Sequence, residues 1–229
     1  MNELDFGAVV RGQYLEWLLA GGAIALSLFL LSLFCGFVLA LLLIGVRSLP
    51  GRLWNAVVAG FVAYHRNVPT LVQLFVWYFG APQLLPAAIG AWINDRNGEF
   101  LFALIALSLN AAAYLSEDLR SGVRATARGQ LEAARALGLS YAQAMRHVVL
   151  PQAIRIAVPA LINQSLILFK TTSLAMAIGV AEMTYASRQI ENETYRTFET
   201  FTIATAFYMV VSFAIMLTGY WYGRRHAAR

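Results

Sequence analysis

Five long apolar runs divide this chain of 229 residues, and they restrict what it can fold into more than any other feature. The runs lie at about 20–46, 53–80, 100–116, 156–181 and 200–222. A helix of about 20 mostly apolar residues crosses a bilayer core about 30 Å thick. Only 13% of the residues are charged, whereas a soluble domain carries about 25%. The pattern predicts an all-α membrane protein of five transmembrane helices that form a single domain over residues 1–229.

Arginine is concentrated in three of the polar segments. The first connector holds Arg47 and Arg52, the long connector at about 117–155 holds six arginines, and the C-terminal tail holds three. In a five-span chain these segments all lie on one side of the membrane lipids, which the positive-inside rule identifies as the cytoplasmic side. We therefore expect a multi-pass protein with its N-terminus outside and its C-terminus in the cytoplasm. The same distribution accounts for the net charge of +5 without a nucleic-acid partner.

The long connector contains a polar segment, residues 129–151, with helix signals of its own. Its first part, "GQLEAARAL", is rich in residues that favour helix. Gly138 is placed to end this helix in a left-handed conformation, and Ser140 with Gln143 forms a capping-box pattern for a second helix. Pro151 is expected to end the second helix, because a residue before proline disfavours the helical region. A plain linker would be shorter, at about 2–8 residues, so we interpret the segment as a docking surface for a cytoplasmic partner.

The chain lacks the motifs that would let it hydrolyse nucleotide by itself. A P-loop requires Gly-x-x-x-x-Gly-Lys followed by Ser or Thr, and the single lysine, Lys170, follows Phe169 inside an apolar run. The histidines at 65, 147 and 226 are far apart and show no metal-ligand spacing. We expect a transport subunit, not an enzyme, with no cofactor of its own. If transport is active, ATP and Mg²⁺ are bound by a partner chain.

Polar side chains at membrane depth are costly, which makes them candidates for function. The fourth run contains six of them: Asn163, Gln164, Lys170, Thr171, Thr172 and Ser173. The amides and hydroxyls could serve in hydrogen bonds between helices, but a lysine near mid-membrane requires a partner or a wet cavity. Arg66 in the second run has two interpretations. Its side chain reaches the cytoplasmic headgroups, or it lies at a helix break created by Pro69, beside a transport pathway.

The stretch "EAARALGLSYAQAMRHVVLP" resembles the EAA loop of ABC importer permeases: Glu-Ala-Ala, three residues, Gly, nine residues, an aliphatic residue, one residue, Leu-Pro. The matching residues are Glu132, Ala133, Ala134, Gly138, Val148, Leu150 and Pro151, with Arg135 beside them. Two further stretches, "RNVPTLVQLFVWYFGAPQLLP" and "FKTTSLAMAIGV", resemble polar amino-acid permeases, above all the glutamate/aspartate type. The resemblance therefore covers most of the chain.

This resemblance implies a type I ABC importer permease fold with cytoplasmic EAA coupling helices, which sit in a cleft of an ABC ATP-binding subunit. It further implies a second permease subunit, an extracytoplasmic solute-binding protein, an amino-acid substrate and a location in the bacterial inner membrane.

The resemblance also bears on the solute. In the family that this segment resembles, the sequence is usually Lys-Asp-Thr-Ser-Leu. Residues 170–174 of this chain are Lys-Thr-Thr-Ser-Leu, so Thr171 takes the place of the aspartate. The missing negative charge favours an acidic or neutral solute, so glutamate or aspartate is the expected substrate. Another polar or basic amino acid is the alternative within this class. A passive channel or secondary transporter is the alternative from a different class, and it would not need the capped hairpin.

Overall fold

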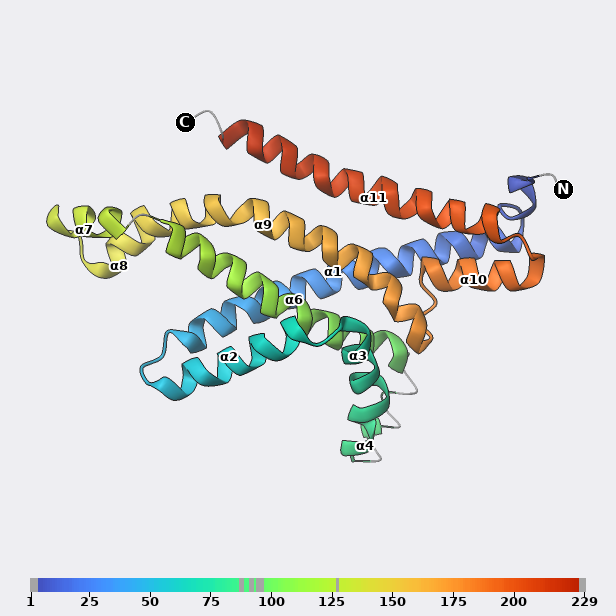
Figure 1. The fold of residues 1–229 in the computed structure, drawn as a ribbon, viewed down its shortest axis with the longest axis horizontal. Coiled ribbons are helices and arrows are strands. Elements are labelled where there is room, and N and C mark those ends of the chain that lie inside the picture. Colours follow the sequence, from blue (N-terminus) through green and yellow to red (C-terminus); the bar gives the residue numbers. More distant parts are fainter. Residues whose placement is uncertain (1–3, 87–88, 91–92, 94–96, 127, 227–229) are drawn as a thin grey trace.

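The computed structural model describes residues 4–86, 89–90, 93, 97–126 and 128–226, and every regular element in this part of the chain is helical. Four helical stretches are long and apolar enough to cross a membrane: residues 13–47, 98–125, 141–178 and 197–224. They correspond to the first, third, fourth and fifth predicted runs. Helices α1 (Gln13–Arg47), α6 (Gly98–Ala125), α9 (Leu150–Thr171) and α11 (Thr197–His226) form the body of the molecule, with α6 packed between α1 and α9 (Figure 1).

Small residues allow the long helices to approach closely. A Cβ added at Gly36 of α1 would lie 2.8 Å from the Cβ of Ala111 in α6, and one added at Gly122 would collide with the carbonyl oxygen of Ala153 in α9. Such contacts between small residues are how helices associate where the solvent is itself apolar. The opposite side of α1 exposes large side chains that suit a hydrocarbon surrounding. They include Leu30, Phe34, Leu41 and Leu42.

The second predicted run, 53–80, is not one continuous helix, and it contains the break at Pro69 that was one of the two interpretations for Arg66. Helix α2 (Arg52–Asn67) ends at Val68, which is extended with φ −92° and ψ 131°. Pro69 has no N–H to donate and its ring disfavours a helical residue before it, so the chain breaks here. Three short segments follow: α3 (Thr70–Phe75), the π-helical turn η2 (Val76–Gly80) and α4 (Ala81–Leu84). They turn away from the axis of α2 (Figure 1).

Pro151 does not end a helix, contrary to the expectation from its neighbours. Helix α8 (Tyr141–Ala144) continues through the π-helical turn η3 (Met145–Val149) into α9. The N–H of Leu150 donates to the carbonyl of Met145, five residues back. This widened turn makes room for the proline ring in the first turn of α9. The predicted connector at about 117–155 is therefore mostly a continuation of its flanking helices, together with α7 (Arg128–Ala136).

The two ends of the molecule differ in character (Figure 1). At one end lie α7, α8, the α1–α2 turn and the C-terminal end of α11. At the other end lie the N-terminal turn η1 (Phe6–Ala8), the 3₁₀ helix η4 (Thr172–Ile178) and α10 (Met183–Thr194), with α10 packed along α1. The sequence at about 86–93 is too broken to span a membrane and predicts a short interfacial helix. Residues 89–90 and 93 are helical, and the rest of that segment, apart from Pro86, lies outside the described residues.

Candidate functional site

The turn between α7 and α8 is fixed by backbone and side-chain caps. The N–H of Gly138 donates to Arg135 and that of Leu139 donates to Ala134, which together form a Schellman motif. Gly138 has φ +87°, the left-handed conformation predicted for it. Ser140 caps α8 with the predicted capping box, in which its side chain and that of Gln143 each accept from the other's backbone N–H. The hairpin therefore has one defined bend.

The hairpin has an inner and an outer surface. Ala134, Ala144 and Val149 are buried where α7 packs against α8 and η3. Leu137 is 83% exposed and Tyr141 61% exposed, at the bend between the two helices. Other EAA-motif residues are also exposed, among them Glu132, Ala133, Arg135, Gly138 and Pro151. Exposed leucine and tyrosine beside charged groups form a surface suited to a protein partner. We call this surface the hairpin tip.

A second ordered feature surrounds the helix break at Pro69. The carbonyl of His65 would accept from residue 69 in a continuous helix, and proline offers no donor. Two buried amides donate to it instead, Gln73 Nε2 at 3.0 Å and Asn110 Nδ2 at 3.0 Å. Gln73 Nε2 also donates to the carbonyl of Val68 at 2.7 Å, and Gln73 Oε1 accepts from Asn110 Nδ2 at 3.3 Å. Gln73 and Asn110, which we call the amide bracket, thus fasten the break to α6.

The amide bracket was not predicted from the sequence. A signal was available, because Gln73 follows Pro69 by four residues and so faces the carbonyls that the proline leaves without donors. Asn110 had no such signal. Its role depends on how α6 packs against α2 and α3, and one sequence does not disclose that packing.

The six polar residues predicted in the fourth run do not converge on one point. Gln164 and Thr172 are buried, whereas Asn163 and Lys170 are exposed, two helical turns apart on the outer side of α9. Among the described residues, no carboxylate lies within 4.0 Å of the Lys170 ammonium. The hydroxyls donate to carbonyls of their own helix: Thr171 to Ile167 at 2.8 Å, Thr172 to Phe169 at 2.7 Å and Ser173 to Lys170 at 2.8 Å. Each of these hydroxyls thereby uses its one donor hydrogen and has only its oxygen lone pairs left for further hydrogen bonds.

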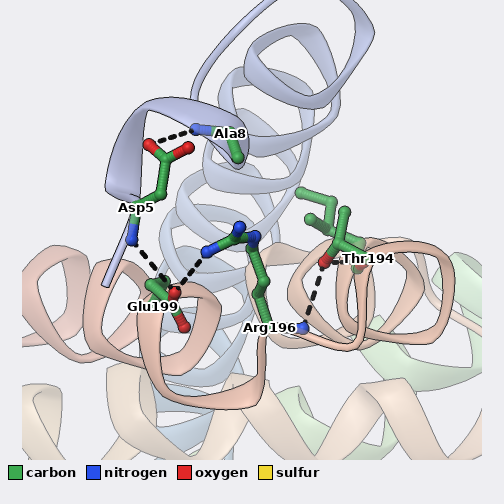
Figure 2. A network of polar contacts seen from close by, with 6 residues as sticks. Asp5, Ala8, Thr194, Arg196 and Glu199 are labelled. Atoms are coloured by element: carbon green, nitrogen blue, oxygen red, sulfur yellow. Dashed lines mark hydrogen bonds and ion pairs between the residues drawn. The ribbon is translucent and has the colours of Figure 1, made fainter. Parts of the chain in front are cut away.

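The end of the molecule opposite the hairpin tip carries its own polar networks. Figure 2 shows Glu199 accepting from the backbone N–H of Asp5 at 3.2 Å and from Arg196 at 2.8 Å, so the N-terminal segment is held against the start of α11. Nearby, the fully buried Glu182 caps α10 and accepts from Tyr208 at 2.6 Å. Burial raises the pKa of the Glu182 carboxyl above its ordinary value, although hydrogen bonds from Thr184, Tyr208 and Tyr185 lower it.

A metal centre would require clustered His, Cys, Asp or Glu side chains among the described residues. None of the groups of His, Cys, Asp and Glu in this part of the chain is arranged to hold a metal ion. The geometry therefore consists of a docking-type surface at one end, a braced helix break within the body, and polar side chains on α9.

Known proteins resemble this chain over nearly all of its length. Residues 32–227 match the family described as binding-protein-dependent transport system inner membrane component. The nopaline transport system permease protein of Agrobacterium fabrum is 37% identical over 218 residues, which cover 93% of this chain and 90% of the relative. The glutamate/aspartate import permease protein of Escherichia coli is 33% identical over 221 residues, with 95% and 89% covered.

One solved structure is similar in both sequence and fold. It is the crystal structure of an amino acid ABC transporter with histidines, with 30% sequence identity and a TM-score of 0.86. The match covers 98% of this chain and 100% of that one.

Proposed function

Because the chain belongs to the family of binding-protein-dependent transport system inner membrane components, we propose that it is the membrane-spanning subunit of an ATP-driven amino-acid importer. The membership assigns it to the permeases of ABC importers, which are transport components and not catalysts. The proposal places ATP and Mg²⁺ on a partner ATP-binding subunit and no cofactor on this chain. Relatives named for different solutes share the family, so the solute itself needs a separate argument.

The observation that carries this proposal is the hairpin tip. A membrane subunit driven by another chain's hydrolysis needs a rigid contact with that chain. Here the Schellman motif and the capping box fix a bend that exposes Leu137 and Tyr141. We assign this surface to the ATP-binding subunit, with Glu132, Ala133, Ala134, Arg135, Gly138 and Pro151 as the coupling residues. Leu137→Glu should abolish co-purification with the ATPase, while Leu49→Glu, on the α1–α2 turn at the same end, should leave it intact. Equal recovery of the ATPase in both variants would reject the assignment.

The proposed assembly contains further partners. We place a second permease subunit against the outer side of α9, and a solute-binding protein at the end that carries α10. This orients the N-terminus outside and the C-terminus in the cytoplasm, as the positive-inside rule requires for the arginine-rich end. A reporter active only in the cytoplasm should give signal when fused after the last residue and none when inserted beside Glu191. Reversed signals would exclude this orientation.

For the solute we propose an acidic amino acid, glutamate or aspartate. Lys170 supplies a positive charge on α9 without a carboxylate partner among the described residues, and Thr171 places a hydroxyl where relatives resembling this segment have aspartate. An acidic solute carries the opposite charge to Lys170 and meets no negative charge at position 171. Asn163, Gln164, Thr172 and Ser173 are the remaining members of this proposed pathway, together with Arg66 on α2.

Two substitutions separate this solute from a basic one. Thr171→Asp should reduce glutamate uptake by at least tenfold, because it places a like charge beside the solute. Lys170→Met keeps the length of the side chain and removes its charge, and it should also reduce uptake sharply. Thr205→Asp, on the exposed side of α11, controls for the general cost of an added carboxylate. Faster uptake of arginine than of glutamate by the parent protein would instead establish a basic amino acid as the solute.

A further inference from the structure

A groove of about 480 Å³ lies between α1, α2 and α6. Its apolar part is formed by Ala59, Val62 and Ala63 of α2. Its polar groups come from all three helices: Arg47, Arg66, Asn67, Tyr114 and Glu117. The volume is in the range of small-molecule sites, about 300–1,000 Å³. None of the α9 residues proposed for the solute lines this groove, so it is a separate place on the molecule.

The arginines that line the groove differ in whether they form an ion pair. Glu117 is shared by three arginines, with Arg47 at 2.5 Å, Arg120 at 3.6 Å and Arg124 at 3.7 Å. Arg66, by contrast, has no carboxylate of the described residues within 4.0 Å. Its guanidinium lies over the Tyr114 ring, 5.3 Å from the centroid, and its side chain is exposed. The Asp118 carboxylate interacts electrostatically with Arg66 without an ion-pair contact, so no carboxylate among the described residues occupies the guanidinium N–H donors of Arg66.

The position of Arg66 is set by the helix break. Its backbone carbonyl accepts from the Tyr114 hydroxyl at 3.4 Å, and the amide bracket holds the residue before it, His65, against α6. Fourteen residues separate Arg66 from Arg52 at the start of α2, which is about 21 Å along a helix at 1.5 Å per residue. A charged side chain within a membrane protein requires a wet cavity or an ionic partner, and the groove supplies open space in front of the guanidinium.

We propose that Arg66 binds the carboxylate of the transported amino acid in this groove, as a second solute station apart from α9. The planar guanidinium offers paired N–H donors that match a carboxylate, which a lysine ammonium does not. The three small apolar residues of α2 accommodate the rest of the solute. The groove recognises the α-carboxylate that all amino acids share, so this station contributes to holding the solute and not to distinguishing side chains. The inference rests on the proposed function.

The test measures equilibrium binding of labelled glutamate, and of its α-amide, to the detergent-purified complex with its partner subunits. The parent complex should bind glutamate at least tenfold more tightly than the α-amide. Arg66→Gln should weaken glutamate binding by at least tenfold and bind both ligands equally. Arg66→Lys keeps the positive charge but lacks the paired N–H donors of the guanidinium, so its affinity for glutamate should lie between those of the parent and of Arg66→Gln. Arg52→Gln removes an arginine at the start of the same helix, outside the groove, and should behave as the parent.

The possible failures are distinguishable. Discrimination between glutamate and its α-amide that persists in Arg66→Gln would overturn this inference alone, because the carboxylate would then be bound elsewhere. The same persistence accompanied by loss of co-purified anionic lipid would assign Arg66 to a lipid phosphate and would also overturn it. Absence of ATP-dependent uptake by the parent complex would reject the proposed function and this station with it. Thermal unfolding of each variant, matched to the parent, shows that altered binding does not reflect a misfolded protein.

Discussion

Single residues decide how this chain tolerates its prolines and its buried polar groups. Pro69 leaves the carbonyl of His65 without its helical donor, and the amide bracket replaces that donor twice over. Gln73 is fully buried and Asn110 is 7% exposed, so these hydrogen bonds form away from water. An unpaired carbonyl in such surroundings costs about 1–3 kcal/mol. The break is therefore a braced feature of the fold and not a flexible joint.

Removing the bracket should destabilise the protein by a predictable amount. Gln73→Leu deprives the carbonyls of His65 and Val68 of a donor, so the free energy of unfolding should fall by about 1–3 kcal/mol. Asn110→Leu should cost a similar amount, and the double variant should cost more than the sum, because each single variant leaves one amide donor on the His65 carbonyl and only the double variant removes both. Thermal unfolding in detergent measures these changes. Gln83→Leu is the control, since that exposed side chain donates only to Phe79 of its own segment, and its effect should stay within about 0.5 kcal/mol. Equal losses in the control and bracket variants would refute the bracing role.

At the scale of the elements, one proline ends a helix and another is accommodated inside a helical stretch. Pro69 ends α2, whereas Pro151 lies inside a helical stretch that runs from Tyr141 to Ile178. The difference is the π-helical turn before Pro151, which moves the carbonyl away from the proline ring. A second π-helical turn, η2, precedes Pro82 in the same way. The rule that a residue before proline leaves the helical region was sound at Val68 and wrong at Leu150, because it takes no account of a widened turn.

Sequence patterns predicted correctly those features that are stabilised by residues close together in the chain. The bend at Gly138 and the capping box at Ser140 depend on residues only a few positions apart, and both were predicted from the sequence. The long apolar helices were also predictable, because their length and composition suffice. Side-chain partners across helices were not. Lys170 and Thr172 are neighbours in sequence, yet one is exposed and the other buried, because the orientation of α9 is set by packing against α6 and α11.

The bend of the hairpin supplies a prediction for coupling. Gly138→Val places a β-branched residue at φ +87°, which should cost about 1–3 kcal/mol in backbone strain. The bend should shift, and transport should fall several-fold while the protein still reaches the membrane. Solute-stimulated ATP hydrolysis by the assembled complex is the measurement. Gly129→Ala serves as the control, because that position in α7 has open space for a Cβ and an ordinary helical backbone. Unchanged stimulation in the Gly138 variant would remove the hairpin from the coupling path.

On the scale of the whole molecule, the functional surfaces are separated along the long axis. The hairpin tip lies at one end, and the Glu182 and Glu199 networks lie at the other (Figure 1). The Arg66 groove and α9 lie between these ends. In the proposed function solute is received at one end and work is accepted at the other, and this layout would separate the two tasks. The arginine distribution predicted the difference between the ends, whereas the groove required the structure, because its lining comes from three helices that are distant in sequence.

The central claim is that this chain is the membrane subunit of an amino-acid importer. The most direct test of it is ATP-dependent uptake by the reconstituted assembly. Proteoliposomes that contain this permease, its permease partner and ATP-binding subunit are loaded with ATP and Mg²⁺, and labelled glutamate is supplied outside with the solute-binding protein. We predict accumulation above the external concentration that requires ATP hydrolysis and is reduced by unlabelled aspartate but not by arginine. Uptake that proceeds equally well without ATP, and stops when the inner and outer concentrations are equal, would contradict the account.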